Sequence, residues 1–268
     1  MENFNYKDYC IGLTIGIKFP PKFSIEDKLG ELSDYFIEKC SFKKRQKIET
    51  PYGTDLQLYK DLMGIVIDRE NFIGTYSYFY GDSIKKKLIP DSSKNNSDIQ
   101  LYGKPAVYTK SYEQTVNDFK KVFNVLFRSF RKTVGVEKIE RVGMVHYFMI
   151  FYDEIKFRYT ESLKKGANLP FGENHNKLAR NQYSYDQTDS YWKNANIEYT
   201  IDKKKQQAGP SKPFGKLYLD IQTYYEPQPF LIDTLGGEEK IIEDLFKQTN
   251  EFIDKSKLFD LEKESNKL

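Results

Sequence analysis

Histidine and cysteine are scarce in this chain of 268 residues, which holds two of each and a single tryptophan. The histidines and cysteines are scattered along the sequence, so they form no zinc cluster with recognisable ligand spacing. The chain also lacks a Walker A loop, a G-x-G-x-x-G loop and the G-x-S-x-G turn of serine hydrolases. These absences leave no recognisable metal, nucleotide-phosphate or hydrolase site. We therefore predict no cofactor and favour a protein that is not an enzyme.

An excess of one charge and a long apolar run are missing too. The chain has 42 basic and 39 acidic residues, a net charge of +3, whereas a dedicated nucleic-acid binder usually has a basic excess. No apolar run is long enough to span a membrane, and residues 1–8 do not begin a signal peptide. We therefore expect a soluble, cytoplasmic protein with no membrane partner. Free thiols at Cys10 and Cys40 fit this compartment better than a disulfide bridge.

Aromatic residues are abundant, with 21 tyrosines and 20 phenylalanines, and they predict a ring-rich core. Apolar and small or polar residues alternate over residues 10–19, which predicts a half-buried strand. Gly12 and Gly16 lie on its less apolar side and would admit a close neighbour, for which a helix is the expected candidate. Ser24 then offers an N-cap for a helix of about four turns.

The strongest pattern lies between residues 111 and 152. Ser111 and Gln114 make a capping box, apolar residues follow at spacings of three and four, and Gly135 is placed to end the helix. The next stretch, Val136–Tyr152, is apolar on both faces, which is typical of a central strand covered on each side. One cover would be a helix, and the other would come from this chain or from a partner.

The remaining patterns complete an α+β plan. They predict a polar edge strand over 41–49, a hairpin around residues 69–71, a second hairpin formed by 197–201 and 214–225, and a last helix from about Glu238. We predict a single α+β domain over residues 1–268, an antiparallel sheet with about three long helices packed on it. Its skeleton fits a ferredoxin-like β-α-β-β-α-β core with an added hairpin and C-terminal helix. Mobile insertions are expected near 82–104, 163–194 and 203–213.

One strand motif resembles a known family. The segment 141–147, R-V-G-M-V-H-Y, resembles the R-[IL]-G-L-R-Y-[IV]-N strand of a sporadically distributed bacterial family of unknown function. The segment 219–223, L-D-I-Q-T, is similar to the late L-D-I-D-V strand of that family. Val145, His146, Phe148 and Gln222 depart from the family pattern. The resemblance implies a component of a mobile or defence-linked bacterial system.

Candidate site residues fall in two groups. His146 and His175 are weak catalytic candidates, because an unperturbed imidazole suits acid–base work, although a hydrogen-bonded structural role is favoured for His146. Basic runs could converge into a phosphate-binding patch, and tyrosines of the 163–194 segment could stack on bases. The candidate binding residues are Lys43, Lys44, Arg45, Lys47, Arg141, Lys177, Arg180, Tyr183, Tyr185 and Trp192.

Three functional hypotheses remain open. The leading one is a non-catalytic binding or scaffold component of a bacterial multi-protein system, with another protein or a second copy as its partner. The second is a ferredoxin-like RNA-binding protein or metal-independent ribonuclease, an analogy that rests on the fold alone. The third is a small-ligand-binding protein with an aromatic-lined pocket.

Overall fold

The computed structural model describes residues 6–42, 44–50, 53–60, 63–77, 100–101, 104–105, 111–151, 178–185, 187–202 and 214–256. Its centre is a nine-stranded sheet in the order β10-β11-β12-β9-β1-β5-β4-β3-β2, and every pair of neighbours is antiparallel. The strands are β1 (Cys10–Lys18), β2 (Lys44–Thr50), β3 (Gly53–Lys60), β4 (Met63–Ile67), β5 (Asn71–Ser77), β9 (Arg141–Phe151), β10 (Leu178–Tyr185), β11 (Trp192–Asp202) and β12 (Phe214–Tyr224).

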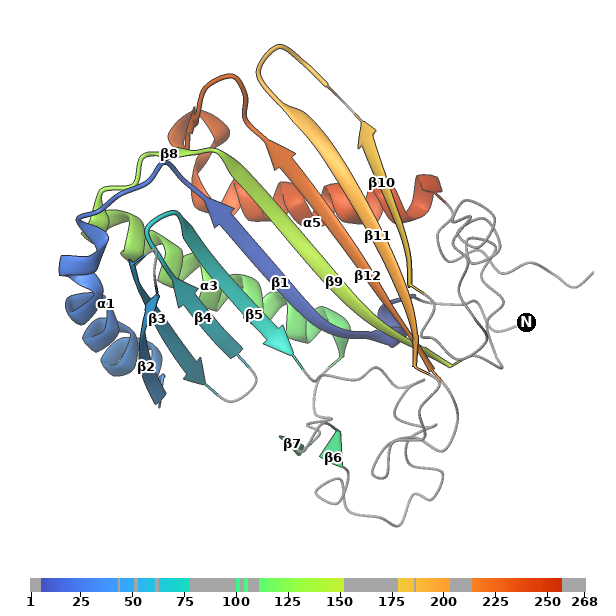
Figure 1. Cartoon of the computed structure of the whole chain (residues 1–268), viewed down its shortest axis with the longest axis horizontal. Helices are drawn as coiled ribbons and strands as arrows, with labels where there is room; N and C mark the ends of the chain where they lie inside the picture. The colour runs from blue at the N-terminus through green and yellow to red at the C-terminus, as the bar shows by residue number, and fades with distance from the viewer. Residues whose placement is uncertain are drawn as a thin grey trace, which may run out of the picture.

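Three helices cover one face of this sheet (Figure 1). They are α1 (Ile25–Cys40), α3 (Tyr112–Val134) and α5 (Gly237–Ser256). The middle helix α3 contacts both of the others, while α1 contacts β3, and α5 contacts β9 and β12. The predicted α+β class, an antiparallel sheet with three helices, is confirmed; the ferredoxin-like label stays a prediction.

Short elements join these layers. They are the 3₁₀ turns η1 (Tyr6–Tyr9) and η3 (Asp233–Leu235), the pair β8 (Lys138–Ile139) and β13 (Phe230–Leu231), and the pair β6 (Gln100–Leu101) and β7 (Lys104–Pro105). Between residues 82 and 109 the structure describes only β6 and β7. Apart from these residues, the expected insertions at 82–104 and 203–213 lie outside the described ranges.

Alternation in β1 decides which face is the core. Leu13, Ile15 and Ile17 are fully or almost fully buried, while Thr14 and Gly16 between them are only half-buried. Antiparallel sheets commonly bury one face and leave the other partly open. The buried side chains of β1 therefore mark the helix-facing side, as the period-two pattern predicted.

Aromatic rings fill the space between α3 and the sheet. The ring centroid of Phe72 on β5 lies 5.4, 5.3 and 5.0 Å from those of Phe123, Phe127 and Phe130 on α3. All four side chains are completely buried. Rings at such distances in tilted or edge-on geometry attract each other beyond the area they bury. The predicted ring-rich core is confirmed.

Both ends of α3 form as the sequence predicted. The amide of Gln114 donates to Ser111 Oγ at 3.2 Å, and the amide of Ser111 donates to Gln114 Oε1 at 3.1 Å. At the other end Gly135 has a φ of 72°, and its amide donates to the carbonyl of Arg131 at 2.8 Å. A left-handed residue at this place satisfies carbonyls that the helix leaves unpaired, and glycine adopts it without a Cβ penalty.

The expectation of a loop over 163–194 is wrong in its second half. Residues 178–185 form β10, and β11 begins at Trp192 rather than at 197. Residues 163–194 contain Gly, Pro, Asn and Ser throughout, which favours a loop by composition. Eight residues of β10 nevertheless pair with β11, from Leu178 with Thr200 to Tyr185 with Lys193, so tertiary pairing overrides local composition.

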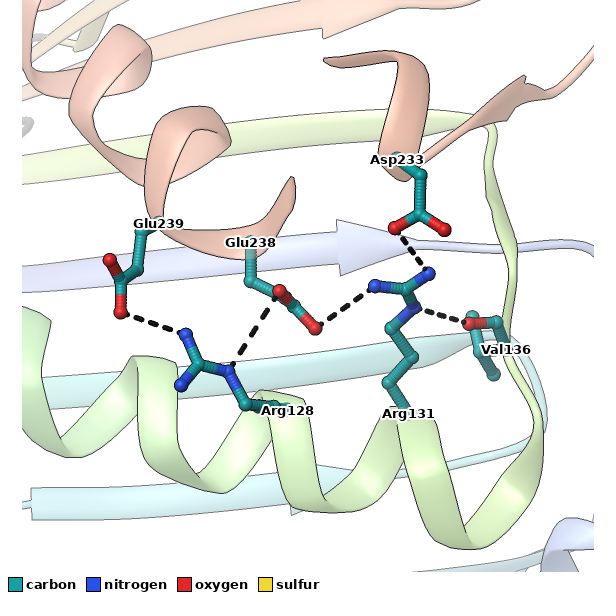
Figure 2. A network of polar contacts seen from close by, with 6 residues as sticks. All are labelled: Arg128, Arg131, Val136, Asp233, Glu238 and Glu239. Atoms are coloured by element: carbon teal, nitrogen blue, oxygen red, sulfur yellow. Dashed lines mark hydrogen bonds and ion pairs between the residues drawn. The ribbon is translucent and has the colours of Figure 1, made fainter. Parts of the chain in front are cut away.

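An arginine network joins the C-terminal end of α3 to the N-terminal end of α5 (Figure 2). Arg131 donates to the carbonyl of Val136 at 3.1 Å, to Glu238 Oε1 at 3.1 Å and to Asp233 Oδ1 at 2.7 Å. Arg128 donates to Glu239 Oε1 at 2.8 Å. The side chain of Glu238 is only 11% exposed, and both arginines have a nitrogen within 4.0 Å of its carboxylate.

We predict that Arg131→Ala lowers the free energy of unfolding by about 2 kcal/mol, because it leaves the carboxylate of Glu238 nearly buried and poorly paired. The nearest remaining cation is Arg128, whose Nε lies 4.0 Å from Glu238 Oε2. Lys240→Ala is the control, since its ion pair with Asp244 is exposed and contributes little to stability. Urea unfolding monitored by circular dichroism measures both. Equal losses in the two variants would contradict the structural role of the network.

Candidate functional site

The sheet surface opposite the helices is called here the open face. On β9 the side chains of Val142, Met144, His146 and Phe148 are buried toward the helices, while Arg141, Gly143, Val145 and Tyr147 between them are half-buried on the open face. No helix of the described part of the chain lies over it (Figure 1). The predicted second cover for this strand is therefore not supplied by the described helices.

A stack of two rings and a guanidinium lies at one end of the open face. The rings of Trp192 and Tyr224 are parallel within 1°, with centroids 4.1 Å apart. The Arg141 guanidinium carbon lies 5.6 Å from the Tyr224 centroid. These residues meet because Tyr224 pairs with Trp192 on one side and with Arg141 on the other. Within the described ranges, Arg141 makes no ion pair.

A hydrogen-bonded chain of polar side chains runs beside this stack. Asn196 Nδ2 on β11 donates to Asp220 Oδ2 at 3.4 Å, and Gln222 Nε2, on the same strand as Asp220, donates to the same oxygen. The Tyr224 hydroxyl donates to Gln222 Oε1, which connects the chain to the aromatic stack. The chain thus concentrates amide donors on the carboxylate of Asp220.

The chain ends at Asn194 in an oxygen without a partner. Asn194 Nδ2 donates to Asn196 Oδ1 at 3.5 Å, but the buried Oδ1 of Asn194 accepts no hydrogen bond from the residues that the structure describes. A buried polar atom left in this state costs about 1–3 kcal/mol. Unsatisfied polarity of this kind is uncommon in a native interior.

Two glycines lie next to each other on the open face, one on β1 and one on β9. Gly16 pairs directly with Gly143. A Cβ on Gly16 would meet only Ile73 Cγ1, at 4.0 Å, whereas a Cβ on Gly143 would lie 3.1 Å from Cγ of Gln222. Gly143 therefore gives Gln222 room to lie across β9, and Gly16 leaves space above the sheet. The expectation that a helix packs on Gly16 is wrong, because the helices cover the other face.

His146 is a core residue. It is 1% exposed, its Nε2 lies 3.0 Å from the Tyr112 hydroxyl, and its ring stacks on Phe148 at 5.9 Å. Burial lowers the pKa of His146 from 6.5 to about 3, because the charged imidazolium would lose its hydration. The imidazole is therefore neutral at physiological pH and has no contact with solvent, which favours its structural role. His175 lies outside the described residues.

The structure brings together only part of the predicted binding set. Arg141 and Trp192 meet through Tyr224, which the sequence did not single out. Lys44, Arg45 and Lys47 belong to β2, whereas Arg180, Tyr183 and Tyr185 belong to β10, and these two strands form opposite edges of the sheet. Lys43 and Lys177 fall outside the described residues.

Neither cysteine forms a disulfide bridge. Cys10 is buried and Cys40 is half-buried, and burial raises the pKa of both thiols. Across the described ranges, no three His, Cys, Asp or Glu side chains are grouped so that they could hold a metal ion. No described helix combines the length and the apolar character needed to cross a membrane.

Comparison with known proteins adds no assignment. No protein-family model matches the chain, and no curated protein matches it significantly. The strand motif that resembles a bacterial family therefore stays a prediction. Of the residues it shares, Arg141, Gly143 and Asp220 lie on the open face, on the adjacent strands β9 and β12, whereas Leu219 and Ile221 are buried toward the helices.

Proposed function

We propose that this protein is a non-catalytic binding component of a multi-protein assembly and that the open face is where it binds its partner. The observation that carries the proposal is the stack of Arg141, Tyr224 and Trp192, a cation and two large rings presented together on a surface without a helical cover. Tyrosine, tryptophan and arginine are the residue types that contribute most binding energy at protein interfaces.

The chemistry of the open face defines the partner. The Arg141 guanidinium has no carboxylate among the described residues, so we expect the partner to supply an acidic side chain there. The space above Gly16 allows a close approach of the partner to the sheet. A polypeptide with an acidic residue at the centre of its contact surface fits both features.

The charged side chains of the open face favour a protein partner over RNA. Asp220 and Glu198 occupy the same face as Arg141, since Asp220 pairs with Val145 and Glu198 with Tyr218. A nucleic-acid backbone is held chiefly by basic side chains, and carboxylates among them repel phosphates. A mixed face of this kind favours a protein partner. The bacterial and defence-linked setting rests on the resemblance alone and stays a prediction.

The test measures complex formation with the proteins encoded next to this gene, using size-exclusion chromatography with light scattering and a binding titration. Arg141→Glu should weaken the complex at least about tenfold, since it places like charges together at a desolvated contact. Lys121→Glu makes the same charge reversal on the exposed surface of α3 and should leave the affinity unchanged within about twofold.

Other occupants are outcomes of the same study. Formation of a homodimer that Arg141→Glu disrupts would identify a second copy as the partner on this face. Salt-dependent retention of single-stranded RNA on a filter, lost in Arg141→Glu, would replace the proposal with the RNA-binding alternative. A monomer that binds none of the neighbouring proteins would contradict the proposed function.

A further inference from the structure

A separate pocket of about 460 Å³ lies between the segment that precedes β11, the β12–β13 connection and β8. One wall is apolar and consists of Pro227, Pro229, Phe230 and Leu231. Lys138, Ser190, Glu226, Gln228 and Thr234 supply polar groups to the same cavity. Its volume falls within the range of small-molecule sites, about 300–1,000 Å³, and its lining combines apolar and polar side chains.

Backbone hydrogen bonds fix the walls of this pocket. The amide of Glu226 donates to the carbonyl of Ser190 at 3.2 Å, which joins the two connections. The amide of Ile232 donates to the carbonyl of Glu137 at 2.9 Å, and Phe230 pairs with Ile139, so the apolar wall is tied to β8. A pocket held in this way exists before a ligand arrives, which reduces the entropy cost of binding.

The two charged side chains in the pocket differ in the contacts that they make. Glu226 Oε2 accepts a hydrogen bond from Trp192 Nε1 at 3.1 Å, so this carboxylate is engaged with the indole. The ammonium group of Lys138 makes no ion pair with any described residue. Leu231, which pairs with Lys138 between β13 and β8, is 44% exposed. The pocket thus combines an accessible apolar surface with an ammonium group that has no ion-pair partner among the described residues and a carboxylate that is hydrogen-bonded to Trp192.

We infer that this pocket binds an apolar group that carries a carboxylate, with the apolar part on Pro227, Pro229 and Phe230 and the carboxylate at Lys138. The C-terminal aliphatic residue of a polypeptide and a small branched carboxylic acid share this chemistry. The inference goes beyond the proposed docking on the open face and does not depend on it.

Trp192 provides the readout, because it is the only tryptophan of the chain and its indole N–H bonds to a pocket residue. The probes are N-acetyl-leucine and N-acetyl-leucinamide, which differ only in the carboxylate, together with a tripeptide ending in leucine and its amide. We expect the acids to change the fluorescence of Trp192 and to bind about fivefold more tightly than the amides. If the tripeptide binds more tightly than N-acetyl-leucine, the natural ligand is a polypeptide terminus. If the tripeptide and N-acetyl-leucine bind equally, the natural ligand is a small acid.

Two variants assign the contact to its residues. Lys138→Gln should remove the preference for acid over amide, while Glu226→Gln should keep it or increase it, because a nearby negative charge is lost. Both side chains are exposed, so folding should be retained, and circular dichroism checks this. Equal binding of acids and amides to the unaltered protein, or no binding of any probe at millimolar concentration, would overturn the inference.

Discussion

The free energy of unfolding should fall by about 2 kcal/mol between pH 6.5 and pH 5 because of His146 alone. Burial holds the pKa of this histidine near 3 in the folded protein, against 6.5 as its ordinary value. Between these two values the unfolded chain binds a proton that the folded protein does not bind. The stabilisation is therefore complete above pH 6.5 and is lost as the pH falls toward 3.

The groups around His146 do not change charge in this window. The pKa of Tyr6 is raised to about 12, and burial raises the pKa of Tyr112 and of Cys10 still further, so all three are neutral near pH 6. The measurement is urea unfolding at several values of pH. His146→Gln should flatten the decline, because it removes the titration and keeps an acceptor for Tyr112.

The unaltered protein is the reference, since its decline between pH 6.5 and pH 5 is the effect attributed to His146. A decline of the same size in His146→Gln would contradict the burial of an uncharged imidazole at the centre of the sheet.

Gly74→Ala should lower the free energy of unfolding by about 2 kcal/mol through overpacking. A Cβ on Gly74 would lie 2.5 Å from Cδ2 and 2.8 Å from Cε2 of Phe123. The ring of Phe123 is completely buried and packs on Phe72, Phe119 and Phe127, so it cannot move aside without disturbing them. The close approach of α3 to β5 thus depends on a glycine at this position.

Gly16→Ala on the neighbouring strand is the control, because its Cβ would meet only Ile73 at 4.0 Å. It should be neutral or stabilise the protein by up to about 1 kcal/mol, since alanine reduces the entropy of the unfolded chain. Differential scanning calorimetry compares the two variants. Similar melting temperatures would show that the sheet is not packed on α3 at Gly74 as described.

The elements of the fold were predictable where local chemistry decides them. The capping box of Ser111 and Gln114, the helical apolar spacing and Gly135 define α3 without reference to any other segment. The strand β10 was missed because the stretch around it contains Gly, Pro, Asn and Ser throughout, and its pairing with β11 is not visible in the sequence. The ferredoxin-like assignment needs more than the order of elements, and it remains a prediction.

The candidate site was predictable only in fragments. Arg141 and Trp192 were named for their chemistry, but nothing in the sequence places them on either side of Tyr224. That contact depends on the register within the β11–β12 hairpin and on its pairing with β9, which lies earlier in the chain. The polar chain through Gln222 and Asn194 was missed for a related reason: alternating polar residues in a strand look like an ordinary solvated face until their neighbours across the sheet are known.

Hydroxyl-radical footprinting of the complex with its partner tests the central claim, that the open face is the binding surface. Tyr224 and Trp192 report on that face. Phe23, just before α1, is 69% exposed, and Tyr35 on α1 is 38% exposed, so these two report on the helical layer. We predict that complex formation reduces oxidation of Tyr224 and Trp192 and leaves Phe23 and Tyr35 unchanged. Protection of Phe23 and Tyr35 with unaltered oxidation of Tyr224 and Trp192 would contradict the account.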